Sequence, residues 1–377
     1  MKKIFEVLKR ELMLVVSVIA AIISLFITPP TKQLIYEIDW HTLGTLFMML
    51  MVLEGFKKEN IFKPLISFGG RFRVMPALSL FLIFGVFFTS MFVTNDVSLI
   101  IFVPLTILLF RGGDKEKYIL PVISMENIAA IRGSLLMPFG SPQNLFLYGQ
   151  SGMSAGTFIA TMAPLCISSA CLLIIFVFVL YRKNVKEQIV LDEKAIAGEW
   201  NPKYKVRRIV YIMLFVLIIW TIVSRTEYWP YVVGIVLLGV IAVDIQILKK
   251  VDYVLLFTFL CFFVFSTGVS NNPAISEFLK KAVAGHEYFW GIGLSQIISN
   301  VPASIVLYPF TENIKALLYG ADTAGLCSLI GSLASVINYR IYVREYPGKG
   351  GQFIKTFTLI SWAFFVIVVI PGYLLSK

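Results

Sequence analysis

The chain has 377 residues, of which 58% are hydrophobic and 15% are charged, whereas soluble domains are about 45–50% apolar and about 25% charged. This composition, with a mean hydropathy of +0.83, excludes a soluble globular protein and indicates a polytopic membrane protein. The net charge of +11 comes from Lys and Arg in loops between apolar runs, as the positive-inside tendency predicts, and gives no support for nucleic-acid binding.

The sequence offers little material for enzyme chemistry. Its four cysteines lie scattered through apolar segments without the spacing of a metal site, and its two histidines lie at the ends of apolar runs. The motif HExxH and the phosphate-binding loop motif of NTPases do not occur. We therefore expect neither an enzyme nor a catalytic residue.

The first predicted elements are a basic N-terminal segment and a span at about 13–29. We expect this span to be retained and not cleaved as a signal peptide, because the apolar run is long and ends at Pro29 and Pro30 without a clear small-residue cleavage site. If basic clusters face the cytoplasm, a second span at about 41–56 returns there. Two apolar arms follow, at about 74–93 and 97–110, and they meet in the motif TNDVSLIIFVP, residues 94–104. The arms predict either two full spans or a hairpin from the cytoplasm whose tip, residues 94–96, stays at membrane depth.

The run at about 118–147 contains MPFGSPQN, whose prolines and glycine interrupt helical hydrogen bonding. It therefore predicts a broken helix, with the break at 138–144. A span at about 155–181 completes a first half, 1–181, and leads to a strongly basic segment, 182–207, which we expect to be a cytoplasmic linker.

A connecting span without a counterpart is predicted in 208–229, before a second half in 230–377. The second half contains spans, a second paired apolar region with its tip at 299–300, a second broken helix at 331–336 and a last span at about 353–375.

Three blocks of the first half recur in the same order in the second half. The motif TNDVSLIIFVP aligns with SNVPASIVLYP, and both carry a hydroxyl residue, then Asn, then a proline nine residues after the Asn. Flanking blocks align as well, and the matched pairs are Asp39/Asp252, Gly55/Gly268, Asn95/Asn300, Pro104/Pro309, Gly140/Gly331 and Ser141/Ser332. The halves should be inverted, because the first has an even number of net crossings and one unpaired span precedes the second.

Inverted repeats with interrupted helices at corresponding positions are typical of secondary transporters. Unwound backbone within the bilayer is tolerated only where it is buried in protein or lines an aqueous cavity. Helices that begin just after Thr94–Asn95 and Ser299–Asn300 would direct partial positive charge toward a bound anion.

The chain resembles the ion transporter superfamily, which includes arsenite permeases, citrate and other anion transporters and sodium-coupled dicarboxylate symporters. The likeness is carried by TNDVSLIIFVP, PFGSPQNL, SNVPASIVL and GSLAS, in that order. The dicarboxylate symporters carry Ser-Asn-Thr at both tips, whereas this chain has Thr-Asn-Asp and Ser-Asn-Val. Its GSPQN and GSLAS pair is more similar to the arsenite permease and related uncharacterised anion permeases.

This resemblance implies an all-α membrane protein of two inverted repeats, each with a re-entrant hairpin and a broken helix, and a homodimer. It also implies substrate and cation sites at the tips and breaks. The expected site residues are Thr94, Asn95, Asp96, Ser141, Gln143, Asn144, Ser299, Asn300, Ser332 and Ser335.

Ionisable groups at membrane depth cost about 2.5–3.5 kcal/mol or more and mark candidate functional residues. Four qualify: Glu54, Asp96, Glu126 and Arg132. Three carboxylates against one arginine cannot all stay ionised in a dry site, so we expect one to be protonated or neutralised by a cation during the cycle. Asp96 or Glu126 is the predicted proton carrier or sodium ligand, and Arg132 either binds substrate or pairs with a carboxylate. Glu54 is predicted equally well as a solvated residue of the membrane interface.

These features together predict a secondary-active transporter of a small inorganic oxyanion or carboxylate, coupled to protons or sodium, in the cytoplasmic (inner) membrane. The N-terminus should be cytoplasmic and the C-terminus external. Apart from a coupling sodium ion or proton, no cofactor is expected, and the expected partners are the small ion, the bilayer and a second copy. A sodium/proton antiporter on the same scaffold and the membrane subunit of an ATP-driven arsenite-type pump are the alternatives.

Overall fold

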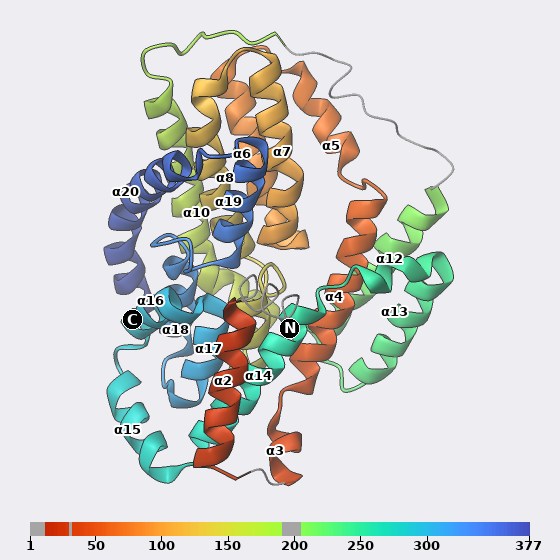
Figure 1. Cartoon of the computed structure of the whole chain (residues 1–377), viewed down its shortest axis with the longest axis vertical. Coiled ribbons are helices and arrows are strands. Elements are labelled where there is room, and N and C mark those ends of the chain that lie inside the picture. Colours follow the sequence, from red (N-terminus) through yellow and green to blue (C-terminus); the bar gives the residue numbers. More distant parts are fainter. Residues whose placement is uncertain (1–11, 30–31, 191–204) are drawn as a thin grey trace.

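The computed structural model describes residues 12–29, 32–190 and 205–377, and the chain there is built from helices (Figure 1). The single β pairing within these residues is an isolated bridge between Val74 and Gln188. Seven of the described helices are long and apolar enough to cross a membrane. The predicted all-α polytopic membrane fold is therefore confirmed.

The first half runs from α2 to α10. Its helices are α2 (Leu12–Ile27), α3 (Lys32–Glu37), α4 (Trp40–Lys58), α5 (Lys63–Phe68), η1 (Gly69–Arg71), α6 (Met75–Val93), α7 (Asn95–Gly112), η2 (Glu116–Tyr118), α8 (Ile119–Ser134), α9 (Pro142–Ser151) and α10 (Ala155–Leu180). The predicted linker lies largely outside the described residues, which resume at 205.

The helices after the linker follow a similar order. They are α12 (Lys205–Ser224), α13 (Trp229–Asp244), η4 (Ile245–Lys249), α14 (Tyr253–Ser270), α15 (Pro273–Val283), α16 (Glu287–Ile298), α17 (Asn300–Leu307), η5 (Tyr308–Phe310), α18 (Ile314–Ala324), α19 (Leu333–Glu345) and α20 (Gly350–Ser376).

The early helices of each half pack against the other half. Helix α2 lies along α14, while α12 and α13 lie along α4, and Figure 1 shows α4, α12 and α13 grouped on one side of the molecule. Glycines permit close contact at both places. A Cβ on Gly55 would lie 2.4 Å from the Tyr211 ring, and one on Gly268 would lie 2.9 Å from Cβ of Ser24. Small residues that let backbones approach are the usual means of helix association in a bilayer.

Two helical hairpins and two interrupted helices are packed together in the molecule. The pair α6–α7 packs on α8, and the pair α16–α17 packs on α18. The two halves also interlock, since α19 packs on α7 and α8, whereas α9 packs on α17 and α18. Each second half-helix therefore sits against the hairpin of the other half.

The arms differ in length between the hairpins. Helices α6 and α7 have 19 and 18 residues, which is close to a full crossing, whereas α16 and α17 have 12 and 8. The asparagines at both tips are buried, with Asn95 5% and Asn300 2% exposed. Neither tip asparagine therefore lies at a water-exposed surface.

The interruptions fall close to the predicted positions. The first covers 135–141, between α8 and α9, and the second covers 325–332, between α18 and α19. The second interruption begins and ends earlier than the predicted break at 331–336. Because it ends at Ser332, Ser335 lies in the first turn of α19.

Candidate functional site

The two hairpin tips share an unusual backbone conformation. Thr94 has φ 74° and ψ 155°, and Ser299 has φ 69° and ψ 160°. This region is almost restricted to glycine, and a side chain there costs about 1–3 kcal/mol. The same strained geometry therefore recurs at the two aligned positions, and each time it carries a hydroxyl residue.

The two interruptions also share their local geometry. Ser141 and Ser332 are extended residues, 1% exposed, that immediately precede α9 and α19. The glycine before each serine is tightly packed: a Cβ on Gly140 would lie 2.1 Å from the Ser134 carbonyl oxygen, and one on Gly331 would lie 2.4 Å from an equivalent oxygen. Each break therefore folds back onto the end of its own preceding helix, where a larger residue does not fit.

Four helices begin at these tips and breaks, and none is capped by its hydroxyl residue. The side-chain hydroxyls of the N-cap residues accept no hydrogen bond from the first helical turn; these residues are Thr94, Ser141, Ser299 and Ser332. By contrast, Ser154 caps α10 through the Thr157 amide, as serine usually does. Apart from the Asp96 N–H, which donates to Oδ1 of Asn95 at the start of α7, the first-turn N–H groups at these ends are not satisfied by the N-cap hydroxyls, so the ends retain partial positive charge that can bind an anion.

Arg132, in the last turn of α8, is fully buried beside this region. None of its three guanidinium nitrogens has a hydrogen-bond partner within the described structure. Its guanidinium carbon lies over the Phe364 ring, 6.0 Å from the ring centroid. A buried charge without a hydrogen-bonding partner costs about 3–5 kcal/mol, so the site is suited to an anion that accepts from these nitrogens.

Asp322 lies in the last turn of α18 and is also fully buried. Its Oδ1 accepts a hydrogen bond of 3.0 Å from Nε2 of Gln143, in the first turn of α9, while its Oδ2 has no partner within the described residues. The carboxylate also interacts electrostatically with Arg132. These contacts bring the first break of the chain to the end of the helix that precedes the second break.

Further buried polar atoms around the breaks lack partners among the described residues, namely Ser141 Oγ, Asn144 Oδ1 and Thr323 Oγ1. The second break is close by, because a Cβ on Gly325 would lie 3.1 Å from both Ile131 and Ser332. The breaks therefore enclose polar groups that could hold a small polar ion.

The sequence-predicted residues separate into groups. Ser141, Gln143 and Asn144 lie with Arg132 at the crossing of the broken helices, and Ser332 lies beside it. Asp96, at the first tip, instead interacts electrostatically with Lys57 of α4 and Asp252 at the start of α14, and its buried Oδ1 has no partner in the described chain. The Asn95 side chain accepts from the Asp96 amide at 2.9 Å.

Two predicted charges lie apart from Arg132. Glu54 forms an ion pair of 2.5 Å with Lys57, and its side chain is 22% exposed, which agrees with an interfacial residue. Glu126 is fully buried and accepts a hydrogen bond from Thr106 of α7. The structure therefore does not bring all three predicted carboxylates to the arginine.

Sequence reasoning missed Asp322. The alignment of the halves places Arg132 near Thr323, which is neutral, and the acidic Asp322 directly precedes that position. The signal was present, because Asp322 is an isolated carboxylate in the apolar run ALLYGADTAGL.

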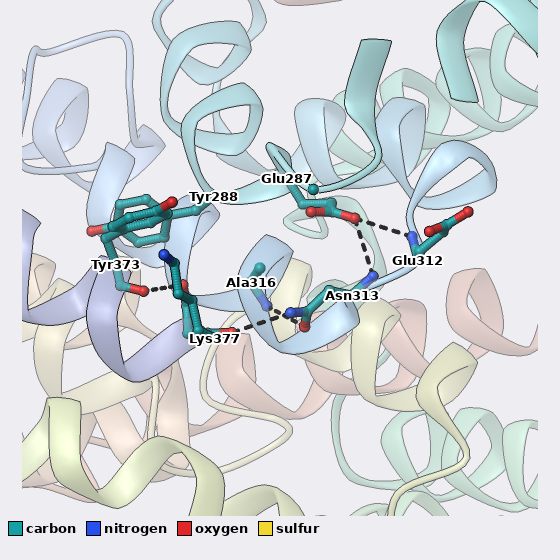
Figure 2. A pocket seen from close by; sticks show the side chains of 9 residues that line it. Glu287, Tyr288, Glu312, Asn313, Ala316, Tyr373 and Lys377 are labelled. Atoms are coloured by element: carbon teal, nitrogen blue, oxygen red, sulfur yellow. Dashed lines mark hydrogen bonds between the residues drawn. The ribbon is translucent and has the colours of Figure 1, made fainter. Parts of the chain in front are cut away.

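A cavity of about 330 Å³ lies elsewhere, at the base of the second hairpin, and is shown in Figure 2. Glu287, which is 2% exposed, accepts hydrogen bonds there from the backbone N–H groups of Glu312 and Asn313 at 3.3 and 3.2 Å. The lining includes two carboxylates and Lys377. Its two glutamates outnumber its one lysine, whereas the crossing of the broken helices sets the buried Arg132 against Asp322, so the crossing is the better candidate for an anion site.

Comparison with known proteins assigns the family. The model of the family described as "Citrate transporter" matches residues 3–331. The chain belongs to this family. It is similar to "Inner membrane protein YbiR" of Escherichia coli (strain K12), with 31% identity over 327 residues, 85% of this chain and 84% of that protein. It is also similar to "Uncharacterized transporter MJ0456" of Methanocaldococcus jannaschii, with 29% identity over 344 residues, 90% and 91% of the two chains.

The predicted membership of the ion transporter superfamily is therefore confirmed, and this member of the citrate transporter family is a multi-pass membrane transporter.

Proposed function

We propose that this member of the citrate transporter family is a secondary-active transporter that binds a small carboxylate or inorganic oxyanion where its two broken helices cross. Transport is coupled to protons or sodium, the two halves form inverted repeats, and the protein works as a homodimer in the inner membrane. Its N-terminus is cytoplasmic and its C-terminus is external.

The observation that carries this proposal is the surplus of buried hydrogen-bond donors around the breaks. Arg132 offers a guanidinium without hydrogen-bond partners, and the uncapped ends of α9 and α19 add backbone N–H groups. Charge-assisted hydrogen bonds from a guanidinium suit carboxylates and oxyanions, which accept in a planar, two-pronged geometry. An anion would thus offset the desolvation of Arg132, which the described residues leave without a hydrogen bond.

The same arrangement suggests how access could alternate. The anion site is made from both halves, because Gln143 of the first half contacts Asp322 of the second at 3.0 Å. If the halves move relative to one another, the groups that surround the ion separate on one side at a time. Interrupted helices at the crossing of inverted repeats have this role in secondary transporters.

The test is anion binding and uptake by purified protein in proteoliposomes, with citrate, sulfate, phosphate and arsenite as probes. Arg132→Gln should weaken binding of the transported anion by about 10-fold to 150-fold, the equivalent of roughly 1.5–3 kcal/mol for a hydrogen bond to a charged group. Arg111→Gln is the matched control, because Arg111 is 43% exposed in a surface ion pair. Its binding should match that of wild type.

Folding is checked separately, by size-exclusion profile and thermal midpoint. Removing Arg132 ends the cost of its own desolvation but leaves the buried Asp322 without the opposite charge with which it interacts, so only Arg132→Gln protein with a wild-type elution profile is compared. Wild-type binding and uptake by folded Arg132→Gln would refute the proposed site. An anion-independent sodium or lithium flux would instead favour the sodium/proton antiporter, which the buried carboxylates of Glu126 and Asp322 could also serve.

A further inference from the structure

A second group of buried polar side chains lies where α7, α8 and α19 meet. It consists of Thr106, Glu126, Asn127, Ser335 and Asn338, all fully buried, and we refer to it as the α7–α8–α19 cluster. Asn127 and Ser335 join the two halves of the chain. The anion site proposed above makes no use of Glu126 or the asparagines.

Three hydrogen bonds in the cluster are donated by Thr106, Asn127 and Asn338. Thr106 donates to Oε1 of Glu126. Nδ2 of Asn127 donates to Oγ of Ser335 at 3.0 Å, and Nδ2 of Asn338 donates to the Ile123 carbonyl oxygen at 2.7 Å. Because a carbonyl oxygen only accepts, this last bond fixes which end of the Asn338 amide is the donor.

The acceptors of the cluster, in contrast, remain open. Oε2 of Glu126, Oδ1 of Asn127 and Oδ1 of Asn338 are buried and have no hydrogen-bond partner within the described chain. This pattern is opposite to that at Arg132, where the donors are unmatched. Three buried oxygens without a donor need a cation or a proton, because each would otherwise forfeit its solvation.

The hydrogen bonds also fix the register of α8 against α19. The Ile123 carbonyl is hydrogen-bonded to Asn338, and Asn127 is hydrogen-bonded to Ser335, so the two helices run antiparallel. Asn127 on α8 and Asn338 on α19 therefore lie in the same helix–helix interface, about one helical turn apart. Glu126 directly precedes Asn127 and reaches α7. Among the described residues, the Glu126 carboxyl group interacts only with the Thr106 hydroxyl, so no positively charged side chain there compensates its negative charge.

We propose that Glu126, with the amide oxygens of Asn127 and Asn338, forms a site for a monovalent cation of the sodium class. Hard cations prefer carboxylate and carbonyl oxygens, and a single positive charge balances the single carboxylate. A proton on Glu126 replaces the cation when the site is empty. The bound cation links α19 of the second half to α7 and α8 of the first, which, given the proposed transport function, couples cation binding to the relative position of the halves.

The experiment measures the thermal midpoint of the purified protein without any anion substrate, at pH 8 and constant ionic strength, in sodium, potassium or choline chloride. Sodium should raise the wild-type midpoint relative to choline, because a ligand that binds only the folded state stabilises it. Glu126→Gln and, separately, Asn338→Leu should abolish the shift. Glu277→Gln should retain it, since Glu277 is 71% exposed in a helical ion pair with Lys281.

Equilibrium binding of radioactive sodium gives a second readout, and each cluster variant should raise the apparent Kd at least tenfold. Equal midpoints in sodium and choline for wild type would overturn the proposal, as would a sodium shift that survives in folded Glu126→Gln. Arg132→Gln separates the two proposals: it should keep the sodium shift while anion binding is lost. Loss of anion binding alone therefore tests the transport site, and loss of the sodium shift alone tests the cluster.

Discussion

Replacing the strained hydroxyl residues of the two tips with glycine should stabilise the protein and impair transport. Thr94 and Ser299 hold φ values of 74° and 69° with extended ψ, a region in which a Cβ collides with the backbone. Their hydroxyls do not cap the helices that follow, so no cap is lost in Thr94→Gly or Ser299→Gly. The strain therefore has no evident compensation in the folded chain.

The magnitude follows from two opposing contributions. Relief of backbone strain gains about 1–3 kcal/mol per site, whereas the greater freedom of glycine in the unfolded chain costs about 0.5–1 kcal/mol. Each variant should therefore gain about 0–2.5 kcal/mol. With an unfolding entropy of roughly 2.1 cal/mol/K per residue, each kcal/mol raises the midpoint of a chain of this length by about 1.3 °C, so the double variant should gain up to about 6 °C.

The assay compares thermal midpoints of purified wild-type and variant protein with initial uptake rates in proteoliposomes. Asn60→Gly is the control, because Asn60 has φ 48° in the turn after α4 and asparagine tolerates that left-handed conformation. Its midpoint should change less than those of the tip variants. A fall in the midpoint of Thr94→Gly or Ser299→Gly would show that the strain argument is wrong, and unchanged uptake in both would remove the tips from the site.

Three further predictions concern the glycines at the breaks, the buried Asp322 and Glu187 in the loop after α10. Gly140→Ala and Gly331→Ala should each abolish uptake, because their Cβ atoms would lie 2.1 and 2.4 Å from carbonyl oxygens, whereas Gly293→Ala, with nothing within 4 Å, should transport normally. Asp322→Asn should lower both KM and Vmax for the anion several-fold, because loss of the negative charge beside the arginine strengthens binding and slows release; a raised KM in uptake kinetics would contradict this. Burial acts to raise the pKa of Glu187, but hydrogen bonds from Tyr118 and Lys115 outweigh it and lower the pKa. The stabilisation from Glu187 is therefore present above its unfolded pKa of about 4.3 and is lost as pH falls through the folded pKa, so Glu187→Gln should flatten the pH dependence of the midpoint below about pH 4.3. A midpoint curve unchanged by that substitution would disprove the assignment.

Much of the fold was accessible from local sequence signals. A hydroxyl residue followed by Asn within apolar sequence predicted both tips, and Gly140–Ser141 and Gly331–Ser332 marked both breaks. Such signals are local because proline, glycine and polar residues disturb helical hydrogen bonding wherever they occur. The length of the arms is harder to predict, since the structure gives 19 and 18 residues to the first pair and 12 and 8 to the second.

The partners of the buried charges could not be predicted in this way. Hydropathy identified Asp96, Glu126 and Arg132 as candidates but could not tell that Asp96 interacts electrostatically with Lys57, or Arg132 with Asp322. Such pairs join residues far apart in the sequence, and their distance depends on how whole helices pack. The periodicity of one helix carries no information about the rotation of another.

The sequence by itself determined three things: that this protein is embedded in the bilayer, at which residues the chain turns back, and at which residues its helices are interrupted. Each follows from the cost of placing particular residues in hydrocarbon. The tertiary structure alone decided that the unmatched guanidinium of Arg132 lies at the breaks, near the unmatched Oδ2 of Asp322, and that the unmatched oxygens of Glu126, Asn127 and Asn338 lie between α7, α8 and α19. The physical reason is that hydrogen-bond partners are assigned only when helices from both halves are packed together.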